Sequence, residues 1–241
     1  MRHRWIFALC LAACDRDDHQ RNFELGAEHL SSETVAGIRF WTVFERESSV
    51  DSPLLVVLHG LGDTAEHFRA TLPDFPVKLQ LALSLAPEPY EDGRQWFAWP
   101  QGMTPEELAA AVWRAEAKLW PAIVGMAHGR KVMVGGFSQG ALLVYAMALR
   151  HPDVITCAFP IGGRMPAALL TRKHGPIAPI VALHGTADER ISIEDDRASI
   201  ALLVAAGANA ELVEFPGVGH TITPAMVESL AAHVRACAHV R

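Results

Sequence analysis

Residues 132–141, VMVGGFSQGA, decide the fold of this 241-residue chain. They place the pattern G-x-S-x-G, from Gly136 to Gly140, between an apolar strand-like run and an apolar helix-like run. A serine at such a junction needs small neighbours, because side chains at the two glycine positions would collide with nearby backbone. The segment therefore predicts a sharp strand-to-helix turn that lifts the hydroxyl of Ser138 above the carboxyl edge of a parallel sheet.

Apolar runs typical of buried strands recur on both sides of this turn. Several are almost continuously hydrophobic, as expected for strands that are covered on both faces of a mainly parallel sheet. The predicted strands are residues 38–44, 54–58, 79–85, 131–135, 154–161, 177–184 and 210–215.

Helical patterns alternate with these strands. Thr104, Pro105 and Glu107 are typical of an N-cap, a first-turn proline and a capping-box partner, and they open a helix predicted to run towards Trp120 and the helix-restricting Pro121. The other predicted helices are residues 138–150, 195–206 and 224–240. The alternation predicts a single-domain α/β fold with a doubly wound sheet. It leaves no room for a large lid, and only residues 162–175 could cover the site.

The hydroxyl of Ser138 is a weak nucleophile and needs a base that is itself held by a carboxylate. In folds with this turn, the chain order is Ser, then Asp or Glu, then His. The histidines after Ser138 are His151, His174, His184, His220, His233 and His239. His220 is the predicted base, because it lies in a glycine-rich loop, PGVGHT, directly after the last predicted strand. His184 closes a strand and is interpreted as structural. His151 ends a predicted helix beside a proline, and His233 and His239 lie in the predicted C-terminal helix, where an exposed face is expected.

The orienting acid should follow the preceding strand. Residues 180–189, IVALHGTADE, run from a strand into a loop there, and Asp188 is the predicted acid. Glu189 and Asp195 are the alternatives, both interpreted as solvated surface residues. Asp188 would accept the Nδ1 proton of His220 and stabilise the imidazolium that forms during attack.

Two backbone amides are predicted to bind the oxyanion of a tetrahedral intermediate. One is the N–H of Gln139, the residue after the nucleophile. The other is the N–H of Leu61 in residues 58–63, LHGLGD, because the flanking glycines let the backbone turn inward after a strand. Chain order argues against catalytic roles for His59 and Asp63, which are interpreted as residues that stabilise this loop.

With these residues placed, the chain resembles the carboxylesterase, acyl-protein thioesterase and lysophospholipase family of α/β-hydrolases. The resemblance covers about residues 54–230 and rests on HGLGD, GGFSQGA, HGTADERI and GVGHTI in the family's order. Ala141 stands where the family has a second glycine. A further match, GRQWF, is similar to the family's aromatic dipeptide and implies that Trp96 and Phe97 wall the acyl pocket, with ordinary core packing as the alternative.

The composition limits the partners of the chain. Half of the residues are apolar, enough for one substantial core. The 21 Lys and Arg residues are outnumbered by 27 Asp and Glu, which gives a net charge of −6, and no basic run is long enough to form a nucleic-acid groove. No nucleic-acid partner is predicted.

The first residues, MRHRWIFALCLAACDRDD, are typical of an export signal. Arg2 and Arg4 provide a cationic start, and the apolar run 5–13 that follows is far shorter than the roughly 20 residues that span a bilayer. The stretch LAAC resembles the lipobox of bacterial lipoproteins, in which the cysteine, here Cys14, is lipidated and becomes the mature N-terminus. Asp15 then resembles an inner-membrane retention signal.

These features predict a signal peptide at 1–13, a tether or irregular lead-in at 14–34 and the α/β-hydrolase domain at 35–241. The protein is predicted to be exported and to face the periplasm, with the N-terminal lipid as its membrane contact. A leader that does not function would instead leave the protein in the cytoplasm.

Cys157 and Cys237 are the thiols that remain outside the leader. Two cysteines make no disulfide framework, and Cys157 lies in an apolar stretch, ITCAFPIG, typical of a buried small residue. No disulfide is predicted.

Together, the residues and the resemblance predict a serine hydrolase that cleaves small-molecule carboxylic esters or thioesters of short to medium acyl length through an acyl-Ser138 intermediate. No metal or organic cofactor is predicted. The alternatives are a polyester or feruloyl esterase, or a peptidase, on the same scaffold. An alternative from another class is a non-catalytic binding lipoprotein.

Overall fold

A central eight-stranded sheet organises the computed structural model, which describes residues 30–45, 48–49, 51–72, 75, 77–170 and 175–238. The strand order is β1-β2-β4-β3-β7-β8-β9-β10. These strands are β1 Leu30–Val35, β2 Ile38–Glu45, β3 Leu54–Leu58, β4 Leu79–Leu85, β7 Val132–Phe137, β8 Ile155–Ile161, β9 Ile180–Gly185 and β10 Ala210–Phe215. In this sheet, β4, β3, β7, β8, β9 and β10 are parallel to one another, and β1 and β2 add an antiparallel edge.

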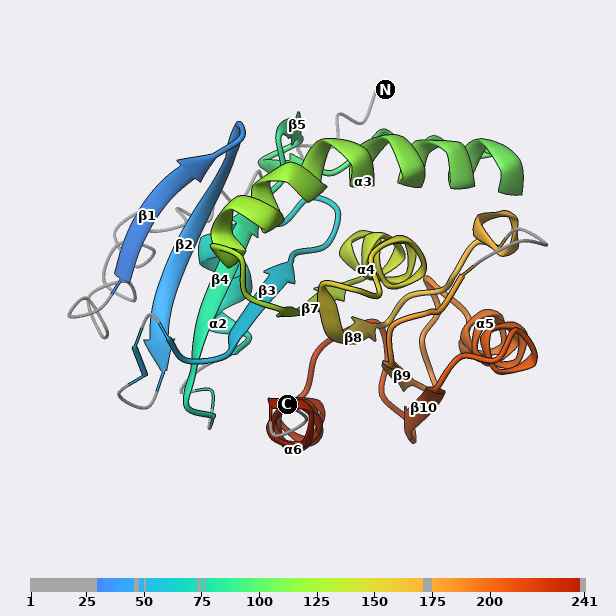
Figure 1. The fold of residues 1–241 in the computed structure, drawn as a ribbon. Helices are drawn as coiled ribbons and strands as arrows, with labels where there is room; N and C mark the ends of the chain where they lie inside the picture. The colour runs from blue at the N-terminus through green and yellow to red at the C-terminus, as the bar shows by residue number, and fades with distance from the viewer. Residues whose placement is uncertain are drawn as a thin grey trace, which may run out of the picture.

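Helices cover both faces of this sheet (Figure 1). α3, α4 and α5 pack on one face, and α2 and α6 pack on the other. Their bounds are α2 Ala65–Ala70, α3 Pro105–Ala127, α4 Gln139–Arg150, α5 Ile193–Ala205 and α6 Pro224–Ala238, with a 3-10 turn, η2, at Ala167–Leu169. A separate ribbon joins β5 Glu88–Tyr90 to β6 Gly93–Gln95. The predicted single-domain α/β fold is confirmed.

The connections agree with the prediction of no large lid. α4 alone joins β7 to β8. In the described part of residues 162–175, Leu169 is buried and the N–H of Met165 donates to Ser199 Oγ of α5 at 2.9 Å. This part of the segment is therefore packed against the body of the protein.

The lead-in prediction is wrong from residue 30 onward, because Leu30–Val35 forms β1. This edge strand pairs with β2 across a two-residue turn in which Ala36 and Gly37 both have positive φ, the backbone of a type I′ hairpin. Residues 31–34 carry no buried side chain, so hydrophobic periodicity could not reveal the strand. The predicted signal peptide, Cys14 and the rest of the lead-in lie outside the described residues.

The predicted end of the first helix is also corrected. α3 begins at the predicted Thr104 cap, with the capping box in place, but it passes through Pro121 and ends only at Ala127. The buried residues Leu119, Ala122 and Ile123 continue the apolar face beyond the proline, so packing outweighs the lost hydrogen bond. Within the described residues, no helix combines the length and the hydrophobicity of a membrane span.

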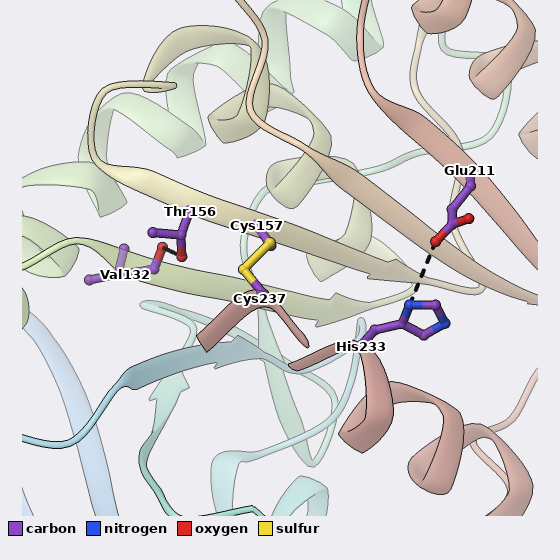
Figure 2. Close-up of a disulfide and its surroundings, with 6 residues drawn as sticks. All are labelled: Val132, Thr156, Cys157, Glu211, His233 and Cys237. Carbon is purple, nitrogen blue, oxygen red and sulfur yellow. Dashed lines mark hydrogen bonds and ion pairs between the residues drawn. A yellow bond between two sulfur atoms is a disulfide. The ribbon is translucent and has the colours of Figure 1, made fainter. Parts of the chain in front are cut away.

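A disulfide joins Cys157 of β8 to Cys237 of α6, contrary to the prediction (Figure 2). The two Cα atoms lie 6.3 Å apart although 80 residues separate them in sequence. Spacing alone could not pair them, because their contact depends on how α6 crosses the sheet. Nearby, His233 of α6 faces Glu211 of β10 at 3.6 Å. The disulfide thus fixes the end of the C-terminal helix covalently to the sheet.

Removing this disulfide is expected to lower the free energy of unfolding by about 2–4 kcal/mol, because the unfolded chain regains the freedom of a long closed loop. The measurement is urea unfolding of the double variant Cys157→Ala/Cys237→Ala against the oxidised wild type. Wild type unfolded in dithiothreitol is the control, since it loses the bond without losing the sulfur atoms. Equal stability of oxidised and reduced wild type would contradict the prediction.

Candidate active site

Ser138 occupies the predicted strand-to-helix turn between β7 and α4. It is the N-cap of α4 and has φ 53° and ψ −114°, a backbone conformation that non-glycine residues rarely adopt. A Cβ at Gly136 would lie 2.7 Å from the carbonyl carbon of Gly140, and one at Gly140 would lie 2.6 Å from the oxygen of Leu58. Both glycines are therefore required by close backbone contact. The turn leaves the serine partly exposed at the carboxyl edge of the sheet.

The structure brings Ser138, His220 and Asp188 into one hydrogen-bonded chain. Ser138 Oγ lies 2.9 Å from His220 Nε2, and His220 Nδ1 lies 2.7 Å from Asp188 Oδ2. Because the carboxylate can only accept, Nδ1 carries the proton and Nε2 is left to accept from the serine hydroxyl. The ring of Phe137 packs against His220 with centroids 4.8 Å apart. This arrangement can deprotonate the hydroxyl as it attacks.

Two adjacent loops hold the acid and the base in place. The N–H of Ala187 donates to the carbonyl of Val218 at 2.9 Å, and the N–H of Thr186 donates to the carbonyl of Phe215 at 2.9 Å. Gly185 allows the close approach, since a Cβ there would lie 2.2 Å from the oxygen of Val218. The loop that carries Asp188 is thus bonded directly to the loop that carries His220.

Asp188 is held as a carboxylate. Its Oδ1 accepts the backbone N–H groups of Arg190 and Ile191, both at 2.9 Å, while Oδ2 accepts from His220. Burial by itself raises the pKa of this carboxyl, but the two backbone donors and His220 outweigh burial, so the pKa lies below its usual value. The ionised form is the one that can orient the base.

The loop after β3 lies beside the nucleophile, as an oxyanion loop must. A Cβ placed on Gly60 would be 3.4 Å from Cβ of Ser138. Within the part of the chain that the structure describes, the N–H groups of Leu61 and Gln139 donate to no protein acceptor. The amide of Gln139 belongs to the first turn of α4, where helix N–H groups are unpaired and favour negative charge.

His59 and Asp63 hold this loop, as the sequence predicts. His59 is fully buried; its Nε2 accepts the N–H of Ala86 at 3.1 Å, so Nδ1 donates to the carbonyl of Gly60 at 2.7 Å. Burial lowers the pKa of His59, which keeps it neutral. Asp63 Oδ1 accepts the N–H of Thr64 at 2.8 Å, next to the start of α2.

With this geometry established, the comparisons decide the family. The family model described as phospholipase/carboxylesterase matches residues 115–238, half of the chain. The chain belongs to the phospholipase/carboxylesterase family. It is thus a hydrolase of the serine esterase type.

Curated relatives and solved structures agree with this assignment. A probable carboxylesterase, SOBER1-like, of Arabidopsis thaliana is 27% identical over 210 residues, which are 76% of this chain and 78% of the relative. Acyl-protein thioesterase 1 of Eremothecium gossypii is 25% identical over 75% of this chain and 86% of its own length. The crystal structure of esterase PE8 has a TM-score of 0.71 at 22% identity, covering 87% of this chain and 99% of that one, which supports the fold.

The side chain of Gln139 has a role in this esterase that the sequence did not indicate. It is fully buried; its Oε1 accepts the N–H of Trp96 at 2.8 Å, and its Nε2 donates to the carbonyl of Phe97 at 2.8 Å. Trp96 Nε1 in turn donates to the carbonyl of His59 at 2.9 Å. Through Trp96, these bonds join the first turn of α4 to the loop after β3, the two segments that carry the predicted oxyanion donors.

Trp96 and Phe97 lie in the hydrophobic core, exposed by 3% and 5%. The surface that they could offer to an acyl chain is therefore small. The structure shows the packing that the sequence left as the alternative, and their role as walls of an acyl pocket stays a prediction.

Replacing Gln139 by alanine is expected to lower the free energy of unfolding by about 2–4 kcal/mol, because the amide of Trp96 and the carbonyl of Phe97 lose their buried partners. Thermal and urea unfolding measure the change. Gln95→Ala is the matched control, since that half-buried side chain makes one long bond in the described structure, 3.4 Å to the carbonyl of Pro89. A loss no larger than that of the control would refute the role of Gln139.

Apart from His184, the other predicted alternatives that the structure describes form no hydrogen bond or ion pair with the triad. Glu189 is exposed, and Asp195 pairs with Arg164 at 3.4 Å. His151 lies 2.6 Å from the buried carboxylate of Glu116. His174 and His239 fall outside the described residues. Among the alternatives that the structure describes, His184, the residue interpreted as structural, comes close to the triad.

Proposed function

We propose that the protein hydrolyses small-molecule esters or thioesters through an acyl-Ser138 intermediate. The observation that carries this proposal is the hydrogen-bonded chain from Ser138 Oγ through His220 to Asp188. In the first step, Ser138 Oγ attacks the acyl carbon, His220 takes its proton, and the N–H groups of Leu61 and Gln139 bind the oxyanion. His220 then protonates the leaving alcohol or thiol as the bond to carbon breaks.

Water completes the cycle. It attacks the acyl-Ser138 carbonyl while His220 accepts one of its protons, and collapse of the second tetrahedral intermediate returns that proton to Ser138 and releases the acid. Asp188 remains ionised throughout and stabilises the imidazolium. These steps need only side chains and backbone amides that the described part of the chain provides.

Labelling with a fluorophosphonate probe tests the nucleophile. Wild type is expected to be labelled on Ser138, whereas Ser138→Ala should give no adduct. Ser49→Ala, at an exposed serine outside the triad, is the matched control and should label like wild type. A wild type that is not labelled on Ser138 would instead favour the non-catalytic binding protein.

We also propose substrates of short to medium acyl length. Support comes from the connections around the site, which contain no large inserted lid in the described residues. Rates on p-nitrophenyl esters from acetate to palmitate test this proposal. A clear optimum at the longest chain would overturn it, and a preference for amide or feruloyl substrates would favour the alternatives on the same scaffold.

We propose that the protein acts outside the cytoplasm, anchored through lipidated Cys14. The apolar leader supports export, and so does the disulfide between Cys157 and Cys237, because disulfides persist mainly in oxidising compartments. The test is the intact mass of the protein recovered from membranes. A diacylated chain that begins at Cys14 is expected, whereas an unmodified chain that begins at Met1 would contradict the proposal.

A further inference from the structure

A second buried histidine–carboxylate pair lies directly behind the acid of the triad. His184 at the end of β9 places Nδ1 2.8 Å from Asp196 Oδ2 of α5, and Asp196 Oδ1 accepts the hydroxyl of Tyr145 of α4 at 2.5 Å. All three residues are fully buried. Three elements of the fold therefore converge on one polar cluster inside the protein, and the mechanism above does not use it.

The partners of His184 favour its doubly protonated form. Nε2 lies 3.0 Å from the carbonyl of Ile191, which can only accept, and Nδ1 faces Asp196. Burial by itself lowers the pKa of His184, but the bonds and charges of its acceptors, led by Asp196, outweigh burial and raise it. Burial also raises the pKa of Asp196 and of Tyr145, whose hydroxyl thus stays a donor.

Each element packed around His184 contributes a charged group. Asp188 follows β9, Asp196 belongs to α5, and Glu214 stands opposite His184 in β10 with its carboxylate bound by Arg197. Two carboxylates therefore face the ring directly. An imidazolium is the form that compensates them inside the protein.

The cluster contacts the triad at two points. His184 Nε2 lies 3.3 Å from Asp188 Oδ2, the same oxygen that accepts from His220. Ile191 makes the second link, because its carbonyl accepts from His184 while its N–H donates to Asp188 Oδ1. His184 thus acts on the carboxylate both through charge and through the loop that holds it.

We infer that His184 is a positioning residue for catalysis: as a buried cation paired with Asp196, it fixes the carboxylate of Asp188 and offsets part of its charge. This inference rests on the proposed function of Ser138, His220 and Asp188. The positive charge lies beside the carboxylate oxygen that pairs with His220, so its removal is expected to change the pH dependence of catalysis.

His184→Gln tests the inference, because glutamine keeps a hydrogen-bond donor and removes the charge. We expect kcat for p-nitrophenyl acetate to fall about 10- to 100-fold with KM changed less than twofold, as for loss of a positioning contact. We also expect the acidic midpoint of the pH profile of kcat/KM to move upward by about half a pH unit or more, since removal of a nearby positive charge eases protonation of His220.

A double variant separates charge from folding. His184→Gln alone leaves the buried charge of Asp196 without its partner and should lower stability. In His184→Gln/Asp196→Asn both members of the pair are neutral, so stability should recover towards wild type. The acidic midpoint of the pH profile of kcat/KM should stay shifted in the double variant. His151→Gln is the matched control, since it removes another histidine that faces a buried carboxylate, Glu116, away from the triad. It should lower stability and leave the pH profile of kcat/KM unchanged.

These experiments distinguish a failure of the positioning role of His184 from a failure of the proposed function. If the double variant regains the wild-type midpoint, or if His184→Gln never shifts it, the inference is overturned and His184 is only structural. The proposed function fails by a different sign, the absence of Ser138 labelling in wild type. A wild type that labels and hydrolyses esters, beside a His184 variant with an unchanged profile, would refute the positioning role alone.

Discussion

His220→Ala is expected to lower kcat for ester hydrolysis about 10⁵-fold, because Ser138 loses the only base within hydrogen-bond reach in the described structure and the acyl-enzyme loses the base that activates water. Burst and steady-state kinetics on p-nitrophenyl acetate measure the effect. The variant should still fold, since His220 is partly exposed and lies on a loop. Thermal unfolding checks this point.

His233→Ala is the matched control for that experiment. This histidine lies in α6, half-buried, and pairs with Glu211 on the surface. Its removal should leave kcat within twofold of wild type. Loss of less than about 10-fold in His220→Ala would mean that another group serves as the base, and the proposed mechanism would have to be abandoned.

Asp188→Asn is expected to lower kcat about 10⁴-fold while leaving the fold intact. The structure provides the reason. The backbone N–H groups of Arg190 and Ile191 both require an acceptor at the Oδ1 position, so the asparagine oxygen stays there and its NH₂ group faces His220. Nδ1 must then accept and Nε2 must carry the proton. In that tautomer, His220 cannot accept a proton from Ser138.

Steady-state kinetics and NMR of the imidazole nitrogens together check this prediction, since NMR reports which nitrogen is protonated. Glu189→Gln is the control, because it removes the neighbouring exposed carboxylate and should leave both readouts unchanged. Full activity in Asp188→Asn would show that orientation of His220 does not depend on Asp188.

The sequence was most informative where local rules act alone. The strand at 54–58 and the strands at 79–85 and 210–215 have the predicted bounds, because a run of apolar residues between turns needs little else to specify a buried strand. It was least informative at β1, where an edge strand with exposed side chains has no hydrophobic pattern, and at Pro121, where packing of α3 overrides a local signal.

The active site shows the same contrast between features that local sequence specifies and features that packing specifies. By itself, the sequence determined the strand–turn–helix around Ser138 and singled out His220 and Asp188, because glycines at a tight turn and the chain order of a sheet are properties of nearby residues. Only the tertiary structure decided that Cys157 meets Cys237, that the side chain of Gln139 ties the start of α4 to the loop of Trp96 and Phe97, and that His184 and Asp196 stand behind the triad. The disulfide and the Gln139 bonds join segments far apart in the chain, whereas His184 and Asp196 lie 12 positions apart on consecutive elements. In each case the partner is set by how a helix packs on the sheet, which no local pattern encodes.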